Sequence, residues 1–156
     1  MLEKLVNDRI RYHLYTNRLL QNYQFGFTPN KSTEDPVFAV VKWARNVFDG
    51  KEIGILVSLD ISGAFYNGWW PKILCQRKKK KCPRNLYMLI QSYLSQRHDQ
   101  LQRGRTSVNK KINKVCLQGS VLSPTFWNLL YDDMQEKKLP EGCNLYAYAD
   151  DALLLY

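Results

Sequence analysis

The sequence lacks any apolar run approaching the roughly 18–20 residues that a membrane-spanning helix needs. Its first residues contain neither an apolar signal core nor a small-residue cleavage site. These absences predict a soluble, intracellular chain with no membrane partner. At 156 residues, the chain has the length of one domain that can bury a core of its own.

Cysteine and histidine are scarce, at four and two residues, and they form no metal-binding pattern. The gaps between Cys75, Cys82, Cys116 and Cys143 include no Cys-x-x-Cys pair, and neither histidine stands at zinc-ligand spacing from a cysteine pair. A disulfide framework is typical of smaller, secreted chains. The four cysteines are therefore interpreted as reduced thiols.

Acidic residues are nearly missing from the middle of the chain. Residues 72–114 contain 13 Lys or Arg and the single acid Asp99, a local excess of +12 in a chain whose net charge is +9. Such a stretch is typical of proteins that bind a nucleic-acid backbone. For the run Arg77-Lys78-Lys79-Lys80-Lys81 alone, a solvated face or a nuclear-localisation patch is an equal alternative. The run permits a nuclear location.

Apolar residues follow both helical and strand periodicity, which predicts an α+β fold. Helices are predicted at residues 2–20, 35–50, 84–94 and 120–134. A largely buried strand is predicted at residues 53–60, two strands joined by a turn at 100–115, and a hairpin at 144–156. Asp35, followed by Pro36, is the predicted N-cap of the second helix.

Three acids stand at the ends of predicted strands. Asp60 closes the strand at residues 53–60, and Asp150 and Asp151 lie between the two arms of the hairpin. Neighbouring carboxylates repel one another unless a cation lies among them, and Mg²⁺ prefers such oxygen ligands. Because adjacent strand residues point to opposite faces, we expect Asp60 and Asp150 to bind metal directly, with Asp151 closer to one ion or acting through water. The alternative for the Asp150-Asp151 pair alone is a polar hairpin turn.

Four motifs, in order along residues 24–156, resemble those of reverse transcriptases from LINE-type (non-LTR) retrotransposons. They are Gln24-Phe25-Gly26-Phe27 with Lys31-Ser32-Thr33-Glu34-Asp35, Leu59-Asp60-Ile61-Ser62-Gly63-Ala64-Phe65, Gln118-Gly119-Ser120-Val121-Leu122-Ser123-Pro124, and Tyr148-Ala149-Asp150-Asp151. The resemblance implies a polymerase palm, an antiparallel sheet with packed helices, plus part of the fingers, truncated before the thumb. It divides the chain into a fingers-like part (residues 1–50) and a palm core (residues 51–156).

The same resemblance implies an RNA-directed DNA polymerase that works by two-metal nucleotidyl transfer. Its partners would be an RNA template, a DNA primer and a dNTP, and its cofactor two Mg²⁺ ions, for which Mn²⁺ can substitute. Asp60, Asp150 and Asp151 would be the catalytic residues and would hold the ions together with the backbone carbonyl of Ile61.

Substrate contacts are implied at four further positions. Phe65 would lie under the incoming sugar and exclude a 2′-hydroxyl, whereas an ordinary core phenylalanine is the alternative. Gln118 and Gly119 would line the nucleotide pocket, where glycine lets the backbone come close. Lys31 would approach the triphosphate from the fingers, and a solvated loop lysine is its alternative.

Departures from the family pattern support a second hypothesis. Tyr66 stands where the family usually has an acid, and Val115 and Leu117 stand where glycine and proline are common. With the basic middle and the early end of the chain, these features fit a catalytically dead, nucleic-acid-binding relic. A third hypothesis, an RNA-templated RNA polymerase, is disfavoured by Phe65, since accepting ribose needs room at that position.

Overall fold

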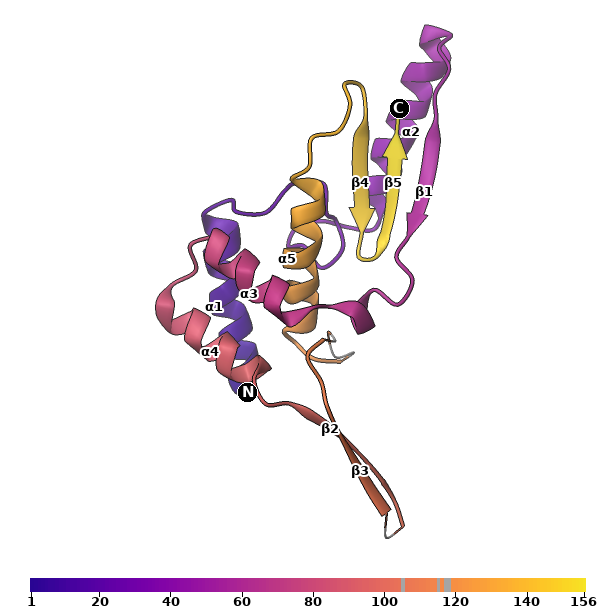
Figure 1. Ribbon diagram of the computed structural model, residues 1–156. Coiled ribbons are helices and arrows are strands. Elements are labelled where there is room, and N and C mark those ends of the chain that lie inside the picture. Colours follow the sequence, from indigo (N-terminus) through magenta and orange to yellow (C-terminus); the bar gives the residue numbers. More distant parts are fainter. Residues whose placement is uncertain (105, 115, 117–118) are drawn as a thin grey trace. The chain divides into compact units, whose positions relative to one another are not determined.

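The computed structural model describes residues 1–104, 106–114, 116 and 119–156 (Figure 1). The helices of the described chain are α1 (Leu2–Thr16), α2 (Glu34–Gly50), α3 (Trp70–Lys79), α4 (Arg84–Leu94), α5 (Ser123–Gln135) and a short 3₁₀ helix, η1 (Phe65–Asn67). Its strands are β1 (Leu56–Asp60), β2 (His98–Arg103), β3 (Thr106–Lys111), β4 (Asn144–Tyr148) and β5 (Asp151–Leu155). The chain forms two compact units, Met1–Leu19 with Phe65–Leu130 and Leu20–Ala64 with Tyr131–Tyr156.

The first unit is a helical cluster in which α1 and α3 both contact α4. Each helix contributes apolar side chains that are no more than 1% exposed, among them Ile10, Leu14, Ile73 and Ile90. These residues recur at helical spacing, so each helix turns one apolar face towards the core. The buried Thr125 Oγ1 of α5 donates a 2.7 Å hydrogen bond to Asn7 Oδ1 of α1, which joins these two helices.

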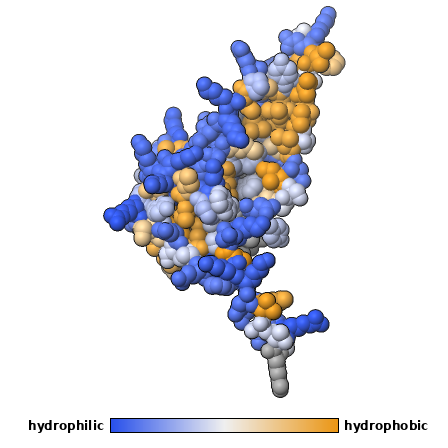
Figure 2. All heavy atoms as spheres, in the orientation of Figure 1, coloured by the Kyte–Doolittle hydropathy of each residue, from blue (hydrophilic) through white to orange (hydrophobic). Residues whose placement is uncertain are grey.

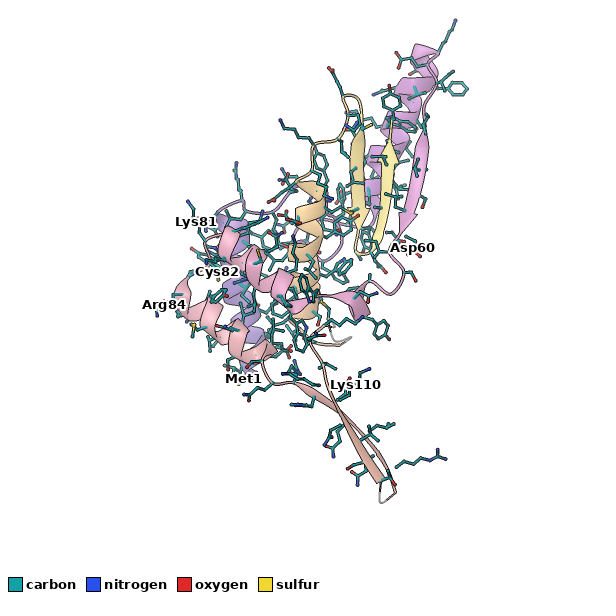
Figure 3. The ribbon with its side chains drawn as sticks, viewed as in Figure 1. Met1, Asp60, Lys81, Cys82, Arg84 and Lys110 are labelled. Atoms are coloured by element: carbon teal, nitrogen blue, oxygen red, sulfur yellow. The ribbon has the colours of Figure 1, made fainter. Side chains whose placement is uncertain are left out.

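A two-stranded antiparallel ribbon, β2–β3, also belongs to the first unit. Its register runs from His98 opposite Lys111 to Arg103 opposite Thr106. Every side chain of both strands is exposed, and Lys110 marks β3 in Figure 3. The ribbon confirms the predicted strand pair, and it presents polar and basic side chains on both faces.

The second unit is built on an antiparallel sheet with the strand order β1-β5-β4. Helix α2 contacts β4. The segment around Gln24 extends β4 by a parallel bridge to Ala147, with Phe25 N donating to Ala147 O at 2.8 Å and Ala147 N donating to Tyr23 O at 2.9 Å. The sheet confirms the predicted hairpin, and it brings β1 alongside β5 despite their distance in sequence.

Two local predictions were wrong. All five side chains of β1 are exposed, because β1 lies at the edge of the sheet beside β5, whereas a largely buried strand was predicted. Figure 2 shows the resulting apolar area on the second unit. The N-cap of α2 is Thr33, and Asp35 lies in the first turn instead, where its Oδ2 accepts a 2.6 Å hydrogen bond from Ser32 N.

Helix α3 was not predicted, because the charges of its last turn and its low overall hydropathy hide the helical pattern. It buries Trp70 and Ile73 nonetheless. All four cysteines are free thiols in the structure. Within the described residues, no helix combines the length and the apolar character required to cross a membrane.

Candidate active site

Two aspartates face each other across neighbouring strands of the second unit. The pairing of β1 with β5 places Asp60 directly opposite Asp151. Residues opposed in this way have Cβ atoms about 4.5–5.5 Å apart on one face of the sheet, and like charges there destabilise the pair. Both side chains are exposed, and Figure 3 shows Asp60 at the end of β1. A divalent cation between the two carboxylates would offset their repulsion.

Asp150, the third of the predicted catalytic aspartates, lies in the hairpin turn. Asp150 is half-buried and follows Ala149 in the two-residue connection between β4 and β5. The register therefore pairs Asp60 with Asp151, while Asp150 stands beside that pair. Among the described residues, no three His, Cys, Asp or Glu side chains form a metal-binding group. The two facing carboxylates offer the hard oxygen donors that Mg²⁺ takes, so this pair fits such an ion.

The segment after β1 turns tightly away from the sheet. Gly63 has a positive φ of 62°, and Ala64 N donates a 3.1 Å hydrogen bond to the carbonyl of Ile61. A backbone carbonyl has a second lone pair that remains able to accept. The Ile61 oxygen is thus fixed by the turn next to Asp60 and retains capacity for one further partner.

The carboxylate of Asp151 affects the pKa of a neighbouring tyrosine, Tyr131. Burial raises the pKa of Tyr131 to about 12, and the negative charge of Asp151 adds to the increase. Both effects disfavour a tyrosinate beside a carboxylate. Tyr131 is therefore neutral at physiological pH and does not compete with Asp151 for a cation.

The predicted sugar-facing residue belongs to the first unit. The ring of Phe65 stacks on Trp127, with 5.3 Å between ring centroids and an interplanar angle of 26°. Its carbonyl accepts a 2.6 Å hydrogen bond from Cys116 N. Cys116 is itself buried, which raises the pKa of its thiol to about 12 and keeps it neutral. Stacking and backbone contact together hold the half-buried Phe65 ring in one orientation.

The predicted nucleotide-pocket motif is described from Gly119 onwards, and Gln118 lies outside the described residues. Gly119 has a φ of 85°, and a Cβ built there would meet nothing within 4 Å. The next residue, Ser120, donates its hydroxyl to Glu3 Oε1, which also accepts from Tyr93 OH at 3.0 Å and from Leu122 N at 3.4 Å. Glu3 of α1 therefore anchors the loop that leads into α5.

Lys31 lies against its own loop in the second unit. Its ammonium donates to the carbonyls of Asn22 and Gln24, the latter at 3.1 Å, and stands 4.5 Å from the ring centroid of Phe25. Partial burial lowers the pKa of Lys31, although Asp35 opposes that effect. The lysine stabilises the loop that carries the first motif.

Similarity to known proteins extends over the whole sequence. Residues 1–156 match the family described as reverse transcriptase (RNA-dependent DNA polymerase). The chain belongs to this family. This reverse transcriptase chain is 34% identical over 161 residues to the RNA-directed DNA polymerase from mobile element jockey of Drosophila funebris. It is 30% identical over 160 residues to the probable RNA-directed DNA polymerase from transposon BS of Drosophila melanogaster.

These relatives come from non-LTR retrotransposons, which confirms the predicted family. Each alignment includes 99% of this chain, and the chain spans 18% of the length of each relative. Among solved structures, telomerase from Candida albicans, in complex with a fragment of telomeric RNA, superposes with a TM-score of 0.76 at 13% identity, over 99% of this chain and 30% of that one. Apo telomerase from Candida tropicalis gives 0.72 at 15% identity, over 97% and 34%. The predicted α+β fold is confirmed.

The basic stretch of the chain is not uniformly at the surface. Lys78, Lys79 and Lys81 are exposed, but Arg77 is completely buried. Arg77 Nη2 donates to Cys82 Sγ at 2.8 Å, and burial lowers the pKa of the guanidinium. The prediction of a surface role was wrong for Arg77, because its position on α3 faces the core.

Sequence reasoning missed two residues that hold the motifs of this reverse transcriptase chain. Gln24 was recognised as part of the first motif but had no role, and Glu3 was not singled out. Both act on residues more than a hundred positions away, Gln24 on Ala149 and Glu3 on Ser120. Local pattern carries no signal for such contacts.

Proposed function

We propose that this chain forms part of an RNA-directed DNA polymerase that extends a DNA primer on an RNA template. The observation that carries the proposal is the placement of Asp60 opposite Asp151 in a chain of the reverse transcriptase family. Two of the relatives reported above are named as RNA-directed DNA polymerases, which supports the same activity. Two opposed carboxylates at the end of a sheet are suited to nucleotidyl transfer, which depends on charge stabilisation more than on covalent chemistry.

The acids would hold the metal ions that the reaction requires. Asp60 and Asp151, helped by Asp150 in the adjoining turn and by the Ile61 carbonyl, would bind two Mg²⁺ ions, or Mn²⁺ in their place. When bound, such ions activate the attacking 3′-hydroxyl and stabilise the leaving oxygen of the triphosphate. The strands supply fixed carboxylates, so little rearrangement is needed as charge develops.

Substrate selection would rest on a rigid ring and an open backbone. Phe65, held against Trp127, would exclude a 2′-hydroxyl by sterics and so favour deoxynucleotides. Gly119 lacks a side chain, which would let the backbone approach a nucleotide beside Gln118. Lys31 would contact the triphosphate after leaving the carbonyls of its own loop.

The polyanionic partners would lie along the basic stretch. Exposed lysines and arginines between residues 72 and 114 would neutralise phosphates of the template and primer. A nuclear location and the division into fingers-like residues 1–50 and palm residues 51–156 stay predictions.

Metal titration tests the acidic site on the chain itself. We expect Mn²⁺, followed by electron paramagnetic resonance, to bind the wild-type chain, and Asp60→Asn or Asp151→Asn to weaken binding by at least about tenfold, because each removes a charged ligand. Asp49→Asn is the matched control, since Asp49 is exposed at the end of α2 in the same unit. Binding that survives both substitutions at Asp60 and Asp151 would contradict the assignment.

Primer extension tests the activity. RNA-templated extension with Mg²⁺ and dNTPs is expected for the wild-type chain and is expected to be lost in Asp60→Asn. A chain that binds Mn²⁺ through both acids and binds RNA, yet extends no primer, would be a nucleic-acid-binding relic and would overturn the catalytic proposal.

A further inference from the structure

The turn between β4 and β5 has a backbone conformation that its residues do not favour. Ala149, the first of its two residues, has a φ of +56°. Tight hairpin turns need positive φ there and normally recruit glycine, asparagine or aspartate, because a Cβ crowds the following carbonyl. Alanine at this position therefore requires support from elsewhere in the molecule.

That support comes from one buried side chain. Gln24 is 5% exposed, and its Nε2 donates a 3.1 Å hydrogen bond to Ala149 O. Its Oε1 accepts from Ala149 N at 3.1 Å and from Gly26 N at 2.9 Å. A single side-chain amide thus forms hydrogen bonds with both the N–H and the carbonyl of Ala149, because an amide both donates and accepts.

The segment that carries Gln24 is itself tied to β4. The bridge between Gln24 and Ala147 holds the side-chain amide of Gln24 beside the turn that follows β4. Gly26 completes the fit, because a Cβ at that position would come within 2.3 Å of Ala149 N. In the Gln24-x-Gly26 sequence, Gln24 therefore supplies the hydrogen bonds to Ala149, and Gly26 leaves the space for its backbone to lie against Ala149.

We propose that Gln24 is a positioning residue for the catalytic hairpin. By holding Ala149 at positive φ, it keeps the connection between β4 and β5 to two residues, and so keeps Asp151 in register with Asp60. A looser turn would let β5 slip, and a slip of one residue would move Asp151 to the other face of the sheet. The consequence for metal binding rests on the proposed function, whereas the effect on the turn does not.

The test first removes the Gln24 hydrogen bonds and then replaces Ala149 by a residue that takes positive φ without them. Gln24→Met keeps the length of the side chain without its hydrogen bonds, and we expect Mn²⁺ affinity to fall at least about tenfold. Adding Ala149→Gly should restore most of that affinity, because glycine takes positive φ without support. Gln21→Met, at an exposed position of the same segment, is the matched control.

Amide hydrogen exchange gives a readout that is independent of metal. The Asp151 amide should exchange faster in Gln24→Met and return towards the wild-type rate in the double variant. This arm separates failure of the inference from failure of the proposed function, since it applies even if no metal binds. A folded Gln24→Met chain whose Asp151 exchange matches wild type, or whose defect Ala149→Gly leaves unchanged, would overturn the role of Gln24.

Discussion

At the residue scale, Arg77 shows that a basic residue in a basic run can serve the core. Its Nε and Nη1 are buried without a hydrogen-bond partner among the described residues, and Nη2 reaches the sulfur of Cys82. A buried cation with incomplete hydrogen bonding is costly, and replacement of buried charges by apolar side chains of similar volume is often neutral or stabilising. The aliphatic stem of Arg77 thus stabilises the fold by packing in the core, whereas its buried guanidinium destabilises the fold.

We therefore expect Arg77→Met to leave the free energy of unfolding unchanged or to raise it by about 1–4 kcal/mol. Arg77→Ala should fall below the methionine variant by about 2–5 kcal/mol, because it leaves a cavity. Urea denaturation of both, with exposed Lys78→Met as control, measures the difference. A methionine variant as unstable as the alanine variant would show that the guanidinium is needed.

At the element scale, α1 is connected to the loop before α5 through one carboxylate. Hydrogen bonds, first that from Ser120 and then those from Tyr93 and Leu122, lower the pKa of Glu3 below its ordinary value, although burial opposes them. A group whose pKa is lower in the folded state stabilises the fold above its unfolded pKa, and this contribution is lost as pH falls through the folded pKa.

The stability that Glu3 provides should be present at pH 6 and should decline below about pH 4.5. Glu3→Gln is expected to lower the urea midpoint at pH 6 and to flatten its dependence on pH between 6 and 3.5. Glu141→Gln, at an exposed position, should leave the pH dependence as in wild type. Equal pH profiles for the wild type and Glu3→Gln would show that the carboxylate does not anchor this loop.

Elements with a clear local pattern were predictable from sequence, and those that depend on tertiary contacts were not. Helix α4 and the β4–β5 hairpin match their predictions, because apolar spacing and the central acids define them locally. Asp60 was correctly placed at a strand end, but its pairing with Asp151 was not foreseen, since the register of two strands so far apart in sequence leaves no local signal. The exposure of β1 was also missed, because an edge position is a property of the assembled sheet.

At the scale of the whole molecule, positive charge concentrates in a few elements. Residues 72–114 carry the +12 excess, and the exposed β2–β3 ribbon presents part of it. Lys110 lies opposite Asp99, whereas Lys111 lies opposite His98, so Lys111 has no acidic neighbour across the ribbon. Lys111 is therefore the better placed of the two for phosphate contact.

We expect Lys111→Ala to weaken RNA binding and to reduce the slope of log affinity against log salt by about 1, the signature of one lost phosphate contact. Lys110→Ala should change the slope less, because the opposite charge of Asp99 lies directly across the ribbon from it. Fluorescence anisotropy over a salt series measures both, and exposed Lys51→Ala in the other unit is the control. Identical slopes for all variants would exclude the ribbon from RNA binding.

The order of strands in the sheet also bears on how the chain folds as it is made. Strand β1 pairs with β5, and the partner of Leu56 is Leu155, which is synthesised 99 residues later. At about 5–20 residues per second, β1 leaves the ribosome roughly 5–20 s before its partner exists. During that interval an apolar edge is open to other chains, so the nascent polypeptide is most vulnerable to aggregation, and most dependent on chaperones, before the acids ever meet.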